Sequence, residues 1–246
     1  MYGKEEMINK VKEQFSKDFG CSIEDLNKNE NVIEETKLKS GRRMLESEGC
    51  FFKMISFQGK LIVSASKEMI PWCNEKLKKA SGTWIAEYYI LRAIDKELNE
   101  HGHQIADIHE YFLPDVTMEE TKPLFNVKWY EKNELDELKE DGRFDEAFAY
   151  DEDCPDVLAV AAFDGEEIMG VAGASMDSED MWQIGVNVVE EYKHKGVASN
   201  LVALIKDEIL RRGKIPYCGT VQSHAFSKNT SINAGFKPAW VEIYSD

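Results

Sequence analysis

The stretch VNVVEEYKHKGVASNLVALIKDEILRRG, from Val186 to Gly213, joins two periodicities through one glycine. Before Gly196 an alternating apolar run is typical of a β-strand, and it ends in the basic tripeptide Lys193–Lys195. After Gly196 the apolar positions recur at helical spacing, namely Leu201, Leu204, Ile205 and Ile209. The stretch therefore predicts a strand, a tight turn and an amphipathic helix from about Gly196 to Arg212.

The junction at Gly196 is suited to hold a phosphate group. A strand that enters a helix through a glycine turn points several unpaired backbone N–H groups at one place, and the helix dipole adds positive charge there. Gly196 permits close backbone approach, Ala198 keeps the first helical turn small, and Lys193 and Lys195 add charge at the rim. The alternative is a capped helix without a ligand, because many strand-to-helix junctions contain glycine.

The residues around this junction predict a mixed α/β domain. Short helices are expected within 133–142 and 143–150, and another at 225–234. Strands are expected at 123–131, at 156–176 as two strands about the turn Asp164-Gly165, at 181–189, at 215–221 and at 236–244.

Length, charge and cysteine content limit the function classes. The chain has 246 residues and a formal net charge of -16, which argues against nucleic acid and anionic membranes as partners. It has no apolar run of about 18 residues to span a bilayer, and its first residues are too charged for a signal peptide. We therefore expect a cytoplasmic protein. Five scattered cysteines predict neither a disulfide framework nor a zinc site.

The first half predicts a second α/β domain. Helical periodicity covers residues 5–19, a further helix begins at Ser22, and two apolar runs about Gln58-Gly59 predict a hairpin. An amphipathic helix is expected from Trp84 to Leu98. The stretch LPDVTMEETKP contains two prolines and breaks both periods, so we place a boundary there. The predicted domains are residues 1–120 and 121–246.

Two segments resemble the GNAT superfamily of N-acyltransferases. Residues Tyr192–Ser199 are similar to the acyl-CoA signature of that family, which reads Gln or Arg, two residues, Gly, one residue, then Gly or Ala. The segment SHAFSKNTSINAGFKP resembles the family's last helix, which runs into a Gly-Phe pair, here Gly235-Phe236. The resemblance covers about residues 125–246. It implies a mixed, mostly antiparallel sheet flanked by helices, with a cleft where two neighbouring strands splay apart.

The resemblance also implies which residues bind acetyl-CoA, the expected acyl donor, and it requires no metal. The strands that would splay apart are those around Trp182–Val189 and Ile215–Val221. The backbone of Val186 and Val188 would hold the pantetheine arm. Residues at the start of the last helix would line the far side, namely Ser223, His224 and Ser227. The pyrophosphate would lie on the turn formed by Lys193, His194, Lys195, Gly196, Val197, Ala198 and Ser199.

The catalytic residues depart from the family pattern. The last helix often carries a tyrosine four residues before the glycine, thought to protonate the leaving thiolate, and this chain has Ser231 there. Substitutes to test are Tyr217, Cys218 and His224. The glutamate that some members use as a base is also absent, and the candidates through a water chain are Asp180 and His224. A thiol of pKa around 8.5 leaves without an acid, so the departures remain compatible with transfer.

These observations predict an N-acetyltransferase that transfers an acetyl group from acetyl-CoA directly to a primary amine of a small molecule or peptide. The acidic chain favours a cationic acceptor. The alternative is a CoA-binding or acyl-CoA-binding regulatory module with little catalysis. Residues 1–120 are expected to finish the acceptor-side wall, and their element order is also compatible with a degenerate GNAT-like half. The sequence leaves an oligomer open.

Overall fold

The computed structural model describes residues 2–44 and 49–246. Contacts divide these residues into two compact units. The C-terminal unit contains Phe112–Lys237 together with the described residues up to Met7, and the N-terminal unit contains Ile8–Tyr111 and Pro238–Asp246. The domain division at residue 120 stays a prediction. Within the two described ranges, every helix is too short or too polar to cross a lipid bilayer.

The C-terminal unit is built on a sheet of five strands in the order β9-β8-β7-β6-β5. Strands β5 to β8 pair antiparallel, whereas β9 pairs parallel to β8. The strands are β5 (Asn126–Glu131), β6 (Asp156–Asp164), β7 (Glu167–Met176), β8 (Met181–Val188) and β9 (Ile215–Val221). The predicted mixed, mostly antiparallel sheet is confirmed.

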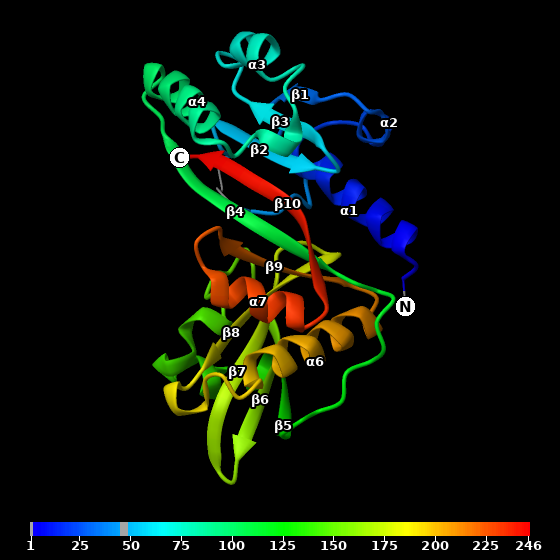
Figure 1. The fold of residues 1–246 in the computed structure, drawn as a ribbon, viewed down its shortest axis with the longest axis vertical. Helices are drawn as coiled ribbons and strands as arrows, with labels where there is room; N and C mark the ends of the chain where they lie inside the picture. The colour runs from blue at the N-terminus through cyan, green and yellow to red at the C-terminus, as the bar shows by residue number, and fades with distance from the viewer. Residues whose placement is uncertain (1, 45–48) are drawn as a thin grey trace. The chain divides into compact units, whose positions relative to one another are not determined.

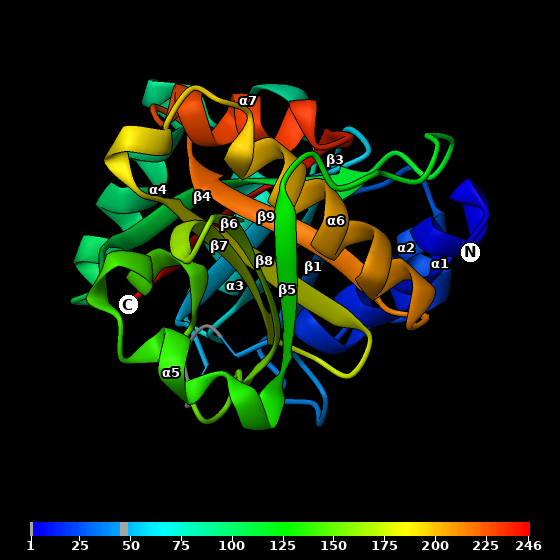
Figure 2. The same ribbon diagram turned by 90° about the horizontal axis from the view of Figure 1, so that it is seen from below.

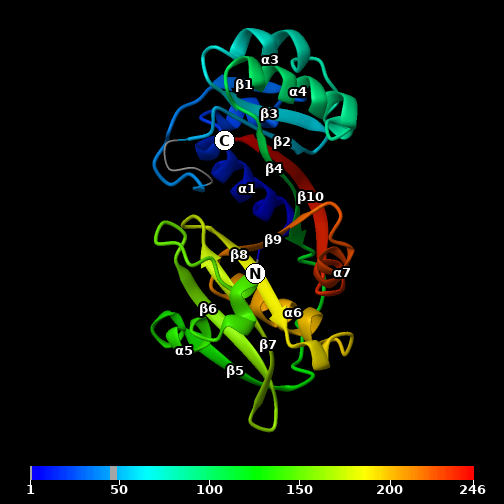
Figure 3. The same ribbon diagram turned by 90° about the vertical axis from the view of Figure 1, so that its left-hand side faces the viewer.

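Helices cover both faces of this sheet. One face carries α6 (Val197–Arg211) and α7 (Ala225–Asn233) (Figure 1), and α5 (Asp136–Lys139) lies on the opposite face. Figure 2 looks at the unit from its β5 end, and Figure 3 shows α6 and α5 on either side of β6 and β7. The 3-10 segments Lys132–Glu134 and Gly142–Ala147 flank α5 in the chain.

Two apolar cores lie on the two faces of the sheet. Along β6, Leu158 and Val160 pack with Leu201 of α6, whereas Ala159 and Ala161 pack in a cluster with residues of the opposite face. Alternate side chains of a strand point to opposite faces. A strand buried on both faces has to be apolar at nearly every position, which explains the continuous run VLAVAAF.

The N-terminal unit is a sheet in the order β1-β3-β2-β10-β4, with α3 and α4 covering one face (Figure 3). Its strands are β1 (Val32–Glu35), β2 (Phe52–Phe57), β3 (Lys60–Ala65), β4 (Ile105–Pro114) and β10 (Phe236–Ser245). Its helices are α1 (Lys4–Asp18), α2 (Ile23–Asn27), α3 (Ile70–Lys76) and α4 (Tyr88–Glu100). The end of β4 and the first residues of β10 and of α1 belong to the C-terminal unit.

Local sequence signals set most of these elements. Ser22 caps α2, because its side chain accepts a hydrogen bond from Asp25 N at 3.1 Å. The hairpin between β2 and β3 turns at Gln58 (φ 52°) and Gly59 (φ 82°), a pair of positive φ values suited to a two-residue hairpin. The prediction that Trp84 belongs to the amphipathic helix is wrong. It ends a 3-10 turn (Gly82–Trp84), is 60% exposed, and α4 begins only at Tyr88.

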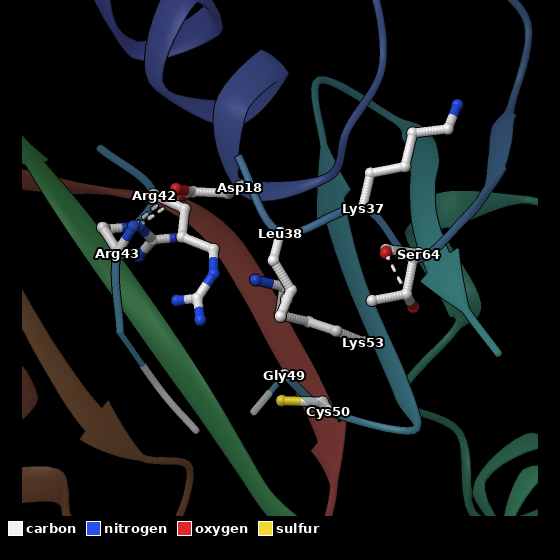
Figure 4. A pocket seen from close by; sticks show the side chains of 10 residues that line it. Asp18, Lys37, Leu38, Arg42, Arg43, Gly49, Cys50, Lys53 and Ser64 are labelled. Carbon is white, nitrogen blue, oxygen red and sulfur yellow. Dashed lines mark hydrogen bonds and ion pairs between the residues drawn. The ribbon is translucent and has the colours of Figure 1, made fainter. Parts of the chain in front are cut away.

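A buried ion cluster ties elements of the N-terminal unit that are far apart in sequence. Arg43 Nε donates to Asp18 Oδ2 at 2.6 Å, and Arg43 Nη2 lies 3.2 Å from Glu242 Oε2. Figure 4 shows Arg43 turned toward Asp18. The guanidinium carbon also lies 5.5 Å from the ring centroid of Phe15 and 5.6 Å from that of Trp240. One cation thus bridges two carboxylates whose side chains are at most 1% exposed.

Replacing Arg43 by alanine should lower the free energy of unfolding by about 3–5 kcal/mol, because two buried carboxylates lose their cation. Urea unfolding followed by tryptophan fluorescence measures this. Lys28→Ala removes the exposed Lys28–Asp25 pair of the same unit and serves as the control, with stability little changed. Equal stability of the Arg43→Ala variant and the unchanged protein would contradict the assigned role.

Candidate functional site

The site begins where β8 and β9 part. The two strands pair in parallel at three positions only, Met181 with Ile215, Trp182 with Pro216 and Gln183 with Tyr217. Beyond these pairs both strands continue, β8 to Val188 and β9 to Val221, without further pairing between them in the described chain. The predicted splay of the two strands is therefore confirmed. It leaves the β9-facing backbone edge of β8 open from residue 184 onward.

A cleft of about 890 Å³ lies at this edge. Strand β8 contributes Val186, Asn187 and Val188 to its lining. The turn and the first residues of α6 contribute Lys193, His194, Gly196, Val197, Ala198 and Ser199, and α7 with its preceding residue contributes His224, Phe226 and Ser227. Most residues that the sequence predicts for the acyl-CoA site thus line one cleft, whereas Lys195 and Ser223 are not among its lining residues.

The turn before α6 leaves backbone donors without a cap. Gly196 is the N-cap residue with φ 82°, a conformation that favours glycine, and no side chain caps the helix. A Cβ built on Gly196 would meet no atom within 4 Å, so the space beside the turn is open. The first N–H groups of a helix have no partner within the helix. Here they face a cleft, together with the positive end of the dipole of a 15-residue helix.

The basic side chains of the turn are held at its edge. Lys193 Nζ lies 2.5 Å from Glu190 Oε2, and this hydrogen bond lowers the pKa of the Glu190 carboxyl. Lys195 Nζ lies 4.9 Å from the ring centroid of Tyr192. His194 has φ 61°, and its ring contacts that of Phe226 edge-on at 5.8 Å between centroids, which joins the turn to α7.

Residues 118–230 match the Acetyltransferase (GNAT) family. The predicted resemblance of the C-terminal half of the chain to the GNAT superfamily is therefore confirmed. The match begins before β5 and ends within α7, so it includes the parting strands and the turn at Gly196. A comparison with curated proteins finds no match.

Solved structures with a similar fold include several acetyltransferases. A GNAT-family protein of Novosphingobium aromaticivorans, described as a putative acetyltransferase, is 13% identical with a TM-score of 0.46, covering 58% of this chain and 66% of its own. A GCN5-related N-acetyltransferase-like protein of Streptococcus suis is 12% identical with a TM-score of 0.48, covering 98% and 100%. The putative acetyltransferase yncA of Salmonella typhimurium, solved with acetyl-CoA, is 14% identical with a TM-score of 0.35, covering 49% and 92%.

Of the four residues predicted to act in catalysis, His224 lines the cleft of the GNAT domain. It is the residue before α7. Tyr217 is 1% exposed, and its hydroxyl donates to Asp177 Oδ2 at 2.5 Å. Ser231 is 4% exposed and donates a hydrogen bond to the Cys218 sulfur. Asp180 precedes β8 at the end remote from the cleft, with its Oδ1 3.9 Å from Lys214 Nζ.

Several further residues line the cleft that the sequence did not single out, among them Glu146, Asn187 and Phe226. Glu146 comes from the 3-10 segment Gly142–Ala147, Asn187 from β8 and Phe226 from α7. Glycine inside a strand often marks a place where another backbone approaches closely. The glycines of β7 and β8 therefore indicated that some segment packs on these strands, and in the structure this segment contains Glu146. Nothing in the local sequence distinguishes Asn187 or Phe226 from ordinary surface residues.

No group of three or more His, Cys, Asp or Glu side chains suited to a metal ion occurs among residues 2–44 and 49–246. Two of the histidines near residue 100 lie beside carboxylates instead. His101 lies 3.7 Å from Glu97, and His103 lies 3.4 Å from Asp246.

Cys218 is a core residue of the GNAT domain. It packs in the apolar cluster beneath α6, and burial raises the pKa of its thiol to about 12, an effect that the hydrogen bond from Ser231 only partly opposes. A thiol with a pKa raised in this way stays protonated near neutral pH, whereas the thiolate is the nucleophilic form. Cys218 is therefore unsuited to nucleophilic catalysis.

Cys218 should stay unreactive in the folded protein at pH 8. With a chromogenic disulfide reagent, the native protein and the Cys218→Ala variant should give the same thiol signal. In denaturant the variant should give one thiol fewer than the unchanged protein, which shows that the reagent detects Cys218 once the protein is unfolded. A fast-reacting thiol that is present in the native protein and lost in the variant would contradict the buried placement.

Proposed function

We propose that the GNAT domain binds acetyl-CoA in the cleft between β8 and β9 and transfers the acetyl group to a primary amine. The family supplies the reaction class. The observation that carries the proposal is the coincidence of two features in one cleft. An unpaired strand edge begins after Gln183, and an uncapped helix N-terminus lies at Gly196.

The proposed binding mode follows from the chemistry of these two features. The pyrophosphate accepts hydrogen bonds from the backbone N–H groups of Val197, Ala198 and Ser199, and the amides of the pantetheine arm pair with the backbone of Val186 and Val188. The cations of the turn add attraction, since Lys193, His194 and Lys195 lie around the same N-terminus. On the far side, the donor lies against His224 and Ser227 at the start of α7. The yncA protein of Salmonella typhimurium is described with acetyl-CoA, and we propose the same donor here.

The transfer needs few groups from the protein. The neutral amine attacks the carbonyl carbon of the thioester, the C–N bond forms, the C–S bond breaks, and the nitrogen releases one proton while the thiolate takes up one. The main contributions of the protein are alignment of the two reactants and a backbone N–H of β8 that donates to the oxyanion. His224, at the start of α7, is the candidate to protonate the thiolate. Asp180, Tyr217 and Ser231 stay predictions without a place at the cleft.

The acceptor is proposed to be a cationic amine of a small molecule or peptide. The chain carries a formal charge of -16, and opposite charge raises the rate of encounter. The contribution of residues 1–120 to the acceptor-side wall remains a prediction.

A second candidate is a module that binds CoA or acyl-CoA and regulates without turnover. The engagement of Tyr217 by Asp177 and of Ser231 by Cys218 favours this candidate, because both hydroxyls are used away from the cleft. Both candidates share the same ligand site. They differ only in whether an amine releases thiol from the bound donor.

Gly196→Glu should weaken CoA binding more than tenfold relative to Gly196→Gln. The two side chains are nearly isosteric, and both meet open space and the same unfavourable φ of 82°. They differ by one negative charge beside the pyrophosphate. Calorimetric titration with CoA measures both dissociation constants. Equal affinity of the two variants would show that the phosphate does not lie at this turn.

The function itself is tested by titrating the full chain with acetyl-CoA and then measuring thiol release against a panel of primary amines. Binding with amine-dependent release establishes the acetyltransferase. Binding without release from any amine establishes the regulatory module, and an absence of binding contradicts both candidates.

A further inference from the structure

Strand β8 presents two different faces beside the cleft. Ile184, Val186 and Val188 pack against the apolar core that includes α6. Side chains alternate along a strand, so Gly185 and Asn187 point to the opposite face, where Val189 packs against the cluster around Phe144. This second face is covered by the 3-10 segment Gly142–Ala147.

Two glycines allow the segment Gly142–Ala147 to pack directly against the sheet. Gly173 of β7 and Gly185 of β8 are register partners. A Cβ on Gly173 would lie 2.2 Å from the carbonyl oxygen of Ala147, and one on Gly185 would lie 2.2 Å from that of Glu146. Any larger residue would push the segment away. The contact fixes the backbone of Glu146 over Gly185, two residues beyond the last residue of β8 that pairs with β9.

Glu146 is the carboxylate of the cleft that has no cation. Two acidic residues line the cleft, Glu146 and Glu190. Glu190 is bound by Lys193 at the phosphate turn. Across the described part of the chain Glu146 forms no ion pair, and its side chain is exposed.

Asn187 supplies a second acceptor in the same cleft. Its Oδ1 is buried and has no hydrogen-bond partner among the described residues. A buried polar atom without a hydrogen bond destabilises the protein until a donor binds it. A carbonyl oxygen is satisfied only by a donor, and a primary amine or ammonium group carries two or three N–H donors. A cationic amine would therefore suit both groups, since it can donate a hydrogen bond to Asn187 Oδ1 and carries the charge opposite to that of the Glu146 carboxylate.

We propose that Glu146 and Asn187 receive the nitrogen of the acceptor amine. This inference rests on the proposed acetyl transfer and assigns its acceptor end. The acceptor donates to the Glu146 carboxylate and to Asn187 Oδ1, on the face of β8 opposite α6. Gly185, beneath Glu146, and Asn187 follow the last paired residue of β8 by two and four positions, so the acceptor lies along the unpaired part of this strand. The negative charge of Glu146 selects acceptors that are cationic.

The test uses the full chain saturated with CoA and three primary amines as probes, namely butylamine, 1,4-diaminobutane and a lysine-containing peptide. Binding is followed through the side-chain amide resonances of Asn187 in nitrogen-15 spectra, assigned with Asn187→Ala. Where thiol release occurs with acetyl-CoA, the KM for the amine and kcat are measured in parallel. Glu146→Gln is compared with Asp145→Asn, the neighbouring exposed carboxylate of the same segment, which does not line the cleft.

The proposal expects an amine-dependent shift of the Asn187 signals. Glu146→Gln should raise the dissociation constant or KM for the amine at least tenfold, with CoA affinity unchanged, and Asp145→Asn should match the unchanged protein. Unshifted Asn187 signals with every probe, or equal values for Glu146→Gln and Asp145→Asn, would overturn it. A protein that binds amines in this way but releases no thiol would retain the acceptor site and contradict only the transfer reaction. Loss of CoA affinity in Glu146→Gln would place that residue at the donor instead.

Discussion

The parting of β8 and β9 is the constraint on which the rest of the site depends. Three parallel pairs hold the strands together, and after Gln183 and Tyr217 each strand gives up a row of backbone hydrogen bonds. Unpaired backbone groups are costly when they are buried without a partner. They are tolerated where solvent or a ligand reaches them, as it can in a cleft of about 890 Å³. The burial of α6 on β6, β7 and β8 stabilises the strands in this arrangement.

Electrostatics in this protein has to be considered locally. The chain as a whole is strongly acidic, yet the turn before α6 combines Lys193, His194 and Lys195 with an uncapped helix N-terminus. Glu190 lies beside these cations and is bound to one of them. A net charge of -16 therefore bears on which acceptors are attracted from a distance, whereas the few charges around Gly196 decide whether a phosphate is held.

The sequence predicted the elements whose signals are local. The helix after Gly196, the turn at Gly165 and the cap at Ser22 each depend on residues within one or two turns of chain, and each is present. Trp84 was misplaced because its spacing fits the helical period, although the chain forms a separate 3-10 turn there.

Features that depend on tertiary contact were not accessible in this way. Glu146 reaches the cleft because two glycines on different strands leave room for its backbone, a relation between residues 146, 173 and 185 that no periodicity encodes. The same holds for Tyr217 and Ser231. As hydroxyl side chains, both were candidates for acid catalysis. In the fold, however, Tyr217 of β9 bonds to Asp177 and Ser231 of α7 bonds to Cys218.

Amide hydrogen exchange of the full chain, with and without CoA, shows whether CoA binds at the parted strands and the turn at Gly196. CoA binding should slow the exchange of the amides of β8 beyond Gln183 and of the first turn of α6 at 197–199. The paired start of β8 and the hairpin of β2 and β3 should be unaffected. Binding of CoA that leaves residues 184–199 unprotected, or that protects another part of the chain in their place, would contradict the claim that the parted strands and the turn at Gly196 form the donor site.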